Sequence, residues 1–186
     1  MKKSGMRIVV LVFCLIGFCL TFATVFADED GHRHRWGRAR HQNEHRRHDF
    51  EPADNPVYAE QCGACHFAYP PGLLPSVSWR EILSNLEDHH GVEVALETQA
   101  RETLSRYLEA NAADKSTSRR AAKLVKSLKG KAPARITETP YIRHKHDDIP
   151  PETFKRKSVG SFSNCTACHP GAQDGEFDDD LVAIPE

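Results

Sequence analysis

Two copies of one short motif, Cys-x-x-Cys-His, constrain this chain more than any other feature of its sequence. The first copy spans residues 62–66 and the second spans residues 165–169. In a helical turn, the two cysteines of such a motif lie on one face and the histidine follows on the same side. Two thiols that can add to porphyrin vinyl groups, with an imidazole that can reach the iron, are what haem c attachment requires. The sequence therefore predicts two covalently bound haems c, anchored by Cys62, Cys65, Cys165 and Cys168, with His66 and His169 as the proximal iron ligands.

Zinc binding, disulfide formation and thiol redox chemistry are the alternatives for these cysteines. The chain has six cysteines, and the two outside the motifs, Cys14 and Cys19, lie in an apolar N-terminal segment. An exported protein with four cysteines would ordinarily form two disulfides, but disulfides do not require a histidine after each pair. A zinc site of four thiolates or a redox dithiol would also leave the two matching histidines unexplained. Haem attachment accounts for every cysteine and histidine of both motifs.

The N-terminus has the pattern of a secretory signal peptide. Three basic residues precede an apolar run of 15 residues at 8–22, which is short for a membrane-spanning helix. Val25 and Ala27 then stand at the −3 and −1 positions of a cleavage site. We therefore expect cleavage after Ala27 and a periplasmic protein, with an uncleaved N-terminal anchor as the alternative.

The charge balance argues against one class of partner. Removal of residues 1–27 takes away three basic side chains and leaves 22 basic against 26 acidic ones, a net charge of −4 with neutral histidine. Haem propionates would make the surface more acidic still. Because an acidic surface repels phosphate backbones, we expect no nucleic-acid partner.

Composition predicts the domain organisation. Residues 28–51 are rich in histidine and arginine and poor in residues to bury, which predicts a disordered arm. The arm's histidines could bind or sense a metal, but no ordered scaffold fixes their geometry. Residues 52–130 should form a first haem region and residues 131–186 a second, packed as one globular unit. The acidic tail, residues 173–186, is expected at the periphery.

Apolar residues recur at helical spacing and no segment shows sustained strand alternation, so the predicted class is all-α. Ser78 begins a capping box, Ser-Trp-Arg-Glu, that should start a helix. The proline-rich residues 131–151 should be extended. The expected fold is a small cytochrome c-like unit organised by its haems, with extended proline-rich connections. The segments predicted to be helical are 56–66, 78–91, 93–111, 118–129 and 154–169.

The sixth ligand of each iron decides between electron transfer and ligand binding. The chain has two methionines, Met1 and Met6, and both lie in the predicted signal peptide. The mature protein therefore cannot use the His/Met ligation that raises the potential of many cytochromes c. The remaining distal candidates are histidine, lysine, a terminal amine, water, or none.

Outside the arm and the motifs, histidines occur in two close pairs. His89 and His90 follow an apolar helical stripe, and we favour His89 as a ligand. Of His144 and His146 we favour His146, with Asp147 as a candidate to orient an imidazole. By proximity, His89 would serve the first haem and His146 the second, with the crossed pairing still open.

Taken together, these features resemble the bacterial dihaem cytochromes c. The resemblance covers most of residues 55–170 and rests on the two motifs, on residues 69–89 and on residues 135–146. In that family both haems are bis-histidine, and the residues that match its distal ligands are His89 and His146. The family usually has an aromatic residue after the first distal histidine, where this chain has His90.

The resemblance implies a function in electron transfer. Members of the family are thought to carry electrons between a membrane-bound b-type cytochrome and a small oxygen-binding monohaem cytochrome c. The predicted function is thus a periplasmic electron carrier with two low-potential bis-histidine haems and no enzymatic activity, which meets a membrane only through its partner or an uncleaved signal. A dihaem peroxidase or oxidase with one open iron site is the alternative. Candidate haem-lining aromatic residues are Tyr69, Trp79, Tyr141 and Phe162.

Overall fold

The computed structural model describes residues 48–186, so the predicted signal peptide and most of the predicted arm lie outside the described residues. Within residues 48–186 the chain forms α-helices and 3₁₀ turns without a strand, which confirms the all-α prediction. The single β-type contact there is a bridge between His89 and Val92. In the same part of the chain, no helix has the length and apolar character needed to cross a membrane.

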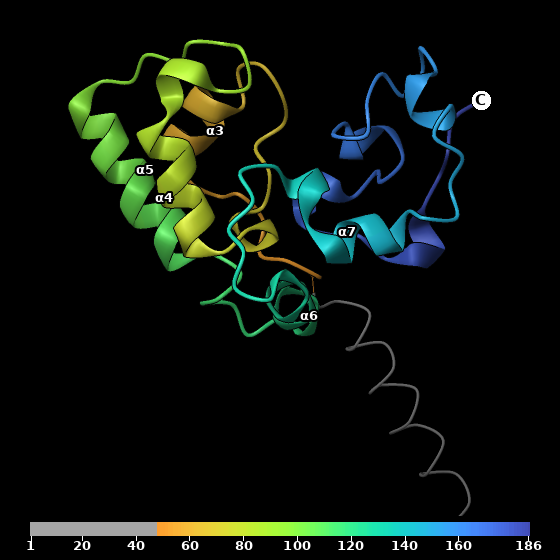
Figure 1. Ribbon diagram of the computed structural model, residues 1–186. Helices are drawn as coiled ribbons and strands as arrows, with labels where there is room; N and C mark the ends of the chain where they lie inside the picture. Colours follow the sequence, from red (N-terminus) through yellow and green to blue (C-terminus); the bar gives the residue numbers. More distant parts are fainter. Residues whose placement is uncertain (1–47) are drawn as a thin grey trace, which may run out of the picture. The chain divides into compact units, whose positions relative to one another are not determined.

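Five α-helices and seven 3₁₀ turns make up this unit. Helices α3, α4 and α5 lie together on one side, and α7 lies with the C-terminal 3₁₀ turns on the other (Figure 1). The α-helices are α3 (Pro56–Cys62), α4 (Ser76–Ser84), α5 (Thr98–Ala110), α6 (Arg119–Leu128) and α7 (Pro140–Lys145). The 3₁₀ turns are η1 (Pro71–Leu73), η2 (Leu86–Asp88), η3 (Ile136–Glu138), η4 (Thr153–Lys155), η5 (Cys165–Ala167), η6 (Ala172–Asp174) and η7 (Asp179–Leu181).

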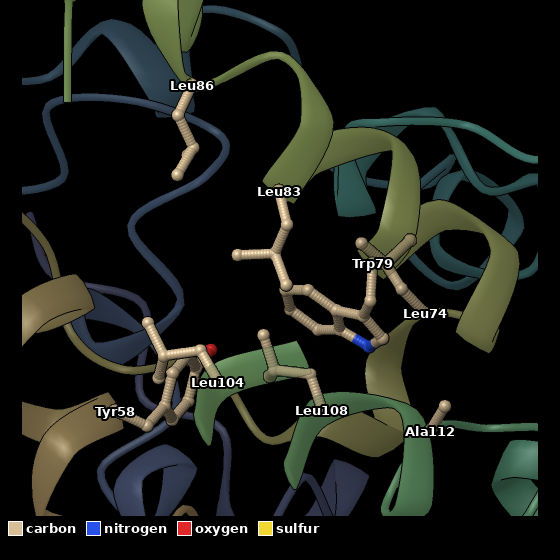
Figure 2. Packing of buried hydrophobic residues seen from close by; sticks show 8 residues of the cluster. All are labelled: Tyr58, Leu74, Trp79, Leu83, Leu86, Leu104, Leu108 and Ala112. Atoms are coloured by element: carbon tan, nitrogen blue, oxygen red, sulfur yellow. The ribbon is translucent and has the colours of Figure 1, made fainter. Parts of the chain in front are cut away.

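One hydrophobic core lies between α3, α4 and α5. Trp79 and Leu83 from α4 face Leu104 and Leu108 from α5, and Tyr58 of α3 closes the cluster (Figure 2). The indole Nε1 of Trp79 donates a 2.8 Å hydrogen bond to the carbonyl of Pro71, so the buried polar atom of the ring has a partner. Six residues of this core also line a cavity: Tyr58, Leu74, Trp79, Leu83, Leu86 and Leu108.

A second core surrounds the apolar face of α6 and joins the two predicted haem regions. Leu124 and Leu128 of α6 pack there with Leu73 from η1, while Tyr141 of α7 lies against the same cluster. Phe50 is buried in this core with 2% of its surface exposed. Phe50 lies within the residues predicted as the arm, so the end of that segment contributes a ring to this core.

The predicted capping box is wrong. Helix α4 begins at Ser76, after Pro75, and Ser78 is fully buried inside the helix. Its first turn is capped instead by a distant carboxylate, because Asp114 accepts hydrogen bonds from the Ser76 backbone N–H at 2.6 Å and from the Ser76 hydroxyl at 2.9 Å. A tertiary contact thus moves the start of the helix by two residues.

Two further predictions about secondary structure are corrected. Residues 131–151 are not simply extended, because they contain η3 and the helix α7, which has Pro140 at its first position. Residues 154–169 form no α-helix and contain only short 3₁₀ turns. Gly160 interrupts this segment with a φ of 83°, a left-handed conformation that is incompatible with helix continuation.

The boundaries of the other helices also differ from expectation. Helix α4 ends at Ser84, and the residues up to Gly91 form η2 and a turn rather than more helix. Helix α5 starts at Thr98, several residues later than predicted. Helix α6 matches its prediction closely, since the Ser118 side chain caps its N-terminus.

The acidic tail is mostly exposed, as expected of a peripheral segment, but it is hydrogen-bonded to the rest of the unit. The backbone N–H of Ala183 donates a 2.9 Å hydrogen bond to the carbonyl of Cys168. Arg156 and Ser158 donate hydrogen bonds to the carbonyls of Pro185 and Glu186, at 2.9 and 2.8 Å. The C-terminal residues are therefore fastened to the chain around the second motif.

Candidate haem sites

The first motif leaves the end of α3. Cys62 is the last residue of this helix, and Gly63 donates its backbone N–H to the carbonyl of Ala59 at 3.0 Å. A Cβ atom on Gly63 would lie 2.2 Å from that carbonyl oxygen, so a larger residue would displace the turn. The turn brings His66 back, and its Nδ1 lies 2.8 Å from the carbonyl oxygen of Phe67. This contact leaves Nε2 of His66 free to bind a metal.

A cavity of about 370 Å³ adjoins the first motif. Both cysteines of the motif, His66 and His89 line it, and the ring centroids of the two histidines are 6.3 Å apart. Burial, with smaller contributions from His90 and His66, lowers the pKa of His89 below its ordinary value. The imidazole of His89 is thus neutral near pH 7, the form that can ligate a metal.

The second motif forms η5, and the backbone N–H of His169 donates to the carbonyl of Cys165 at 2.8 Å. A second cavity, of about 260 Å³, is lined by both cysteines of this motif together with His146 and His169. The ring centroids of His146 and His169 are 6.0 Å apart. Nδ1 of His146 lies 2.7 Å from the carbonyl oxygen of Ile142, which again leaves Nε2 free. Burial lowers the pKa of His169.

These two ring separations match the spacing of two imidazoles on opposite sides of one metal ion. A metal–imidazole bond of about 2 Å, plus about 1 Å from the nitrogen to the ring centre, places two opposed rings about 6 Å apart. The structure brings His66 together with His89, and His169 together with His146. The cavities, their paired cysteines and their facing imidazoles therefore fit two covalently attached haems.

The other two candidate histidines occupy different positions. His144 is largely exposed, with 82% of its side chain accessible, and its Nδ1 lies 2.9 Å from a carboxylate oxygen of Asp147. Asp147 thus contacts His144, whereas His146 is oriented by a backbone carbonyl. His90 lines the first cavity beside His89, with a ring centroid separation of 4.7 Å, and its φ of 58° is left-handed. That conformation turns the chain sharply after His89.

The environment of the cysteines opposes the alternative of a redox dithiol. Burial raises the pKa of the Cys62 thiol to about 11, and burial likewise raises the pKa of Cys165 to about 11. Redox-active pairs have a depressed thiol pKa, because the thiolate is the reactive form. No disulfide joins the four cysteines of the described residues. The raised pKa values of Cys62 and Cys165 therefore argue against a redox dithiol at either motif.

Aromatic side chains line both cavities, and they include all four residues named from the sequence. Trp79 and Tyr69 line the first cavity, and Tyr141 and Phe162 line the second. Three further phenylalanines line the second cavity and were missed, because nothing in their sequence spacing marks them. They are Phe50, Phe154 and Phe177.

The two cavities adjoin. Ile136, Thr137 and Cys165 line both of them. The hydroxyl of Tyr69, which lines the first cavity, donates a 2.7 Å hydrogen bond to the carbonyl of Ser163 beside the second motif. Two residues that are 94 positions apart in the chain are thereby joined, and the wall between the sites is only a few side chains thick.

The second cavity has a charged edge. Lys145 and Asp179 form a 2.6 Å ion pair, and Arg120 contacts Asp49 at 2.5 Å and Asp179 at 3.7 Å. The hydrogen bond from Lys145 is the main reason that the pKa of Asp179 lies below its ordinary value. Because Asp179 belongs to the C-terminal tail, this network ties the tail to α6 and α7.

Comparison with known proteins identifies the family. A family model described as dihaem cytochrome c matches residues 58–177. The chain belongs to the dihaem cytochrome c family. A member of this family contains two covalently bound c-type haems, and the two motifs with their cavities fit such haems.

Solved structures of the same kind share its fold. The diheme cytochrome c from Rhodobacter sphaeroides is 38% identical, with a TM-score of 0.61, and the match covers 68% of this chain and 99% of that one. The diheme cytochrome type c from Shewanella baltica OS155 is also 38% identical, with a TM-score of 0.58 and coverage of 70% and 93%. No curated protein matches this dihaem cytochrome c.

Proposed function

We propose that this dihaem cytochrome c is a periplasmic one-electron carrier whose two irons are each held by two histidines. The ligand pairs are His66 with His89 and His169 with His146. The observation that supports this proposal is the facing arrangement of both imidazole pairs, at 6.3 and 6.0 Å, across cavities lined by the motif cysteines. Each bound haem supplies a metal that accepts and releases one electron.

The chain's own residues orient two of these ligands. The carbonyls of Phe67 and Ile142 accept hydrogen bonds from Nδ1 of His66 and His146, which fixes the tautomer and the ring orientation. Hydrogen bonding to Nδ1 also strengthens Nε2 as a donor. Strong imidazole donation without a methionine ligand favours low reduction potentials at both sites.

The arrangement of the cavities suits exchange of electrons between the two sites. The shared wall of Ile136, Thr137 and Cys165 keeps the sites close without opening them to each other. The aromatic lining excludes water, which reduces the solvent rearrangement that accompanies a change of valence. The Tyr69–Ser163 hydrogen bond holds the two motifs at a fixed separation.

The alternative is a peroxidase or oxidase, which needs one iron with a vacant or labile position. The two facing histidine pairs argue against such a vacancy. The decisive measurement is low-temperature EPR and absorption spectroscopy of the oxidised protein as isolated. We expect two low-spin signals that differ from each other, because the imidazole planes are inclined by 30° in the first pair and by 72° in the second. A high-spin signal from the pure protein would favour the enzyme.

Export and partners are part of the same proposal. The N-terminal pattern supports cleavage after Ala27, and the four non-disulfide motif cysteines fit a protein loaded with haem outside the cytoplasm. Cell fractionation with mass spectrometry of the mature N-terminus tests this location. We further propose a membrane b-type cytochrome and a small oxygen-binding cytochrome c as redox partners, and stopped-flow mixing of the purified proteins would test both the exchange and its direction.

A further inference from the structure

The strongest concentration of charge on this protein lies on α6 and is remote in sequence from all eight proposed haem-binding residues. Residues 115–131 contain seven basic side chains and no acidic one. Six of the seven are exposed: Lys115, Arg119, Lys123, Lys126, Lys129 and Lys131. We call these six residues the basic face.

The basic face is built by the helix geometry of α6. Arg119, Lys123 and Lys126 are four and three residues apart, so they lie along one side of the helix. The opposite side carries Leu124 and Leu128, which are buried in the second core. Because the apolar side is already covered, the exposed side of α6 can interact with a partner only through its charge.

The positive charge of this face is not neutralised within the described residues. Ion pairs there involve Arg120, which binds Asp49, and Lys115, which lies 3.8 Å from Asp114. The other five members of the basic face have no acidic group within 4 Å among residues 48–186. The net charge of the protein is negative, so a face with five unpaired cations suggests an interaction with an anionic partner.

The C-terminal tail carries the opposite charge. The tail, residues 173–186, contains six acidic residues and no basic one, and it is fastened beside the second cavity. The chain also enters the described unit next to α6, because Asp49 is bonded to Arg120 and Ser118. Residues 28–47, which precede this entry point in the sequence, contain six arginines. The same residues also contain four acidic side chains, so the clearest excess of positive charge lies in residues 115–131.

We propose that the basic face of α6 binds an anionic phospholipid surface and so holds this dihaem cytochrome c against a membrane. Each lysine or arginine close to an anionic bilayer strengthens binding by about fivefold, and the attraction is confined to roughly a Debye length. Three unpaired cations along one side of α6, with Lys129 and Lys131 just after its C-terminus, match the continuous negative charge of such a surface.

Vesicle binding by the haem-loaded protein tests this proposal, with haem absorbance as the measure of the bound fraction. The probes are phosphatidylcholine vesicles with and without phosphatidylglycerol, at low and near-physiological salt. The test variant is the double charge reversal Lys123→Glu/Lys126→Glu. The matched control is Lys155→Glu/Lys157→Glu, which makes the same change in net charge at two exposed lysines outside α6.

We expect binding to the anionic vesicles alone, weakened by salt, and lowered about 25-fold or more by the α6 double variant but much less by the control. Equal losses in both variants would show a general charge effect and would overturn the proposal. Absence of binding to anionic vesicles would also overturn it. If polyglutamate then retained the protein through Lys123 and Lys126, an acidic protein would be the partner instead. The absorption spectra of the variants should be unchanged, which would show that both haems are still bound and ligated. A loss of vesicle binding would then say nothing against the proposed electron-transfer function.

Discussion

The first cavity rests against two packed α-helices, whereas the second is enclosed by 3₁₀ turns, by α7 and by the C-terminal tail. Trp79 and Leu83 beside the first cavity belong to a core in which α4 packs against α5 and α3. Around the second cavity, Phe154 and Phe162 pack against each other at a ring separation of 4.7 Å, and both rings lie near His146. These phenylalanines face the place of the haem rather than a separate side-chain core.

This difference shows two ways of building the same type of site. The first region places its ligands on a scaffold that side chains stabilise, so its geometry depends little on the cofactor. The second region has few regular hydrogen bonds, and its chain is held by contacts such as the Lys145–Asp179 ion pair and the bond from Ala183 to Cys168. We therefore expect the second region to depend more on its bound haem and on the tail.

Removing one distal histidine should produce the largest difference between the two haem sites. In His89→Ala we expect one high-spin haem and one unchanged low-spin haem, and in His146→Ala the complementary result, because each variant loses one iron ligand. EPR of the oxidised proteins measures both outcomes. The neighbouring substitutions His90→Ala and His144→Ala serve as controls and should leave both haems low-spin. Two low-spin haems in His89→Ala would show that the ligand has been assigned wrongly.

A core substitution should affect the first region through stability rather than ligation. Leu104 is fully buried between α4 and α5, so Leu104→Ala should lower the free energy of unfolding by about 2–5 kcal/mol. Denaturant unfolding followed by circular dichroism measures this loss. The control Val77→Ala alters an exposed residue of α4 and should change stability by less than about 0.5 kcal/mol. A similar small effect of Leu104→Ala would mean that this core does not support the first region.

Truncation of the tail should affect the second site alone. Deleting residues 182–186 removes Val182 from the cavity lining and the hydrogen bonds of Ala183, Pro185 and Glu186. Greater solvent exposure favours the oxidised iron, so the potential of the second haem should fall while that of the first is unchanged. Spectroelectrochemistry resolves the two values. The control Ile184→Ala, which removes only an exposed side chain, should change neither reduction potential. Equal shifts of both potentials in the truncated protein would contradict the idea that the tail supports the second site alone.

In the first region, one substitution should raise the stability, in contrast to the loss expected for Leu104→Ala. The hydroxyl of Ser78 is buried in α4 with no hydrogen-bond partner among the described residues. Ser78→Ala removes this unsatisfied group and improves helix propensity, so it should raise the free energy of unfolding by about 0.5–1 kcal/mol. The control is Ser84→Ala, because the Ser84 hydroxyl donates to the Glu81 carbonyl at 2.8 Å. Destabilisation by Ser78→Ala would reveal a partner for this hydroxyl in the folded protein.

The smallest effect concerns the pH dependence of the tail. The hydrogen bond from Lys145 holds the pKa of Asp179 below its ordinary value of 3.8, so the tail contact is fully present above that pH. It should weaken as the pH falls through the folded-state pKa. Amide exchange at Ala183, corrected for intrinsic rates, should accelerate in that range for the natural protein but not for Asp179→Asn. The control Asp180→Asn should behave like the natural protein.

The sequence by itself determined the chemistry of this protein, because haem attachment needs cysteines and a histidine at fixed local spacing. The two motifs predicted the cofactor, and the absence of methionine after residue 6 excluded methionine as an iron ligand in the mature protein. Helix α6 was also predictable, since its cap and its apolar stripe are local features.

The tertiary structure decided how these parts come together. The start of α4 depends on Asp114, and the ring pairs His66–His89 and His146–His169 depend on contacts between segments far apart in the chain. The loops around the second motif and the tail could not be predicted from local propensity, because short 3₁₀ turns without periodic apolar residues are stabilised by long-range contacts. Local spacing thus set the cofactor, and nonlocal packing set which histidines face each other.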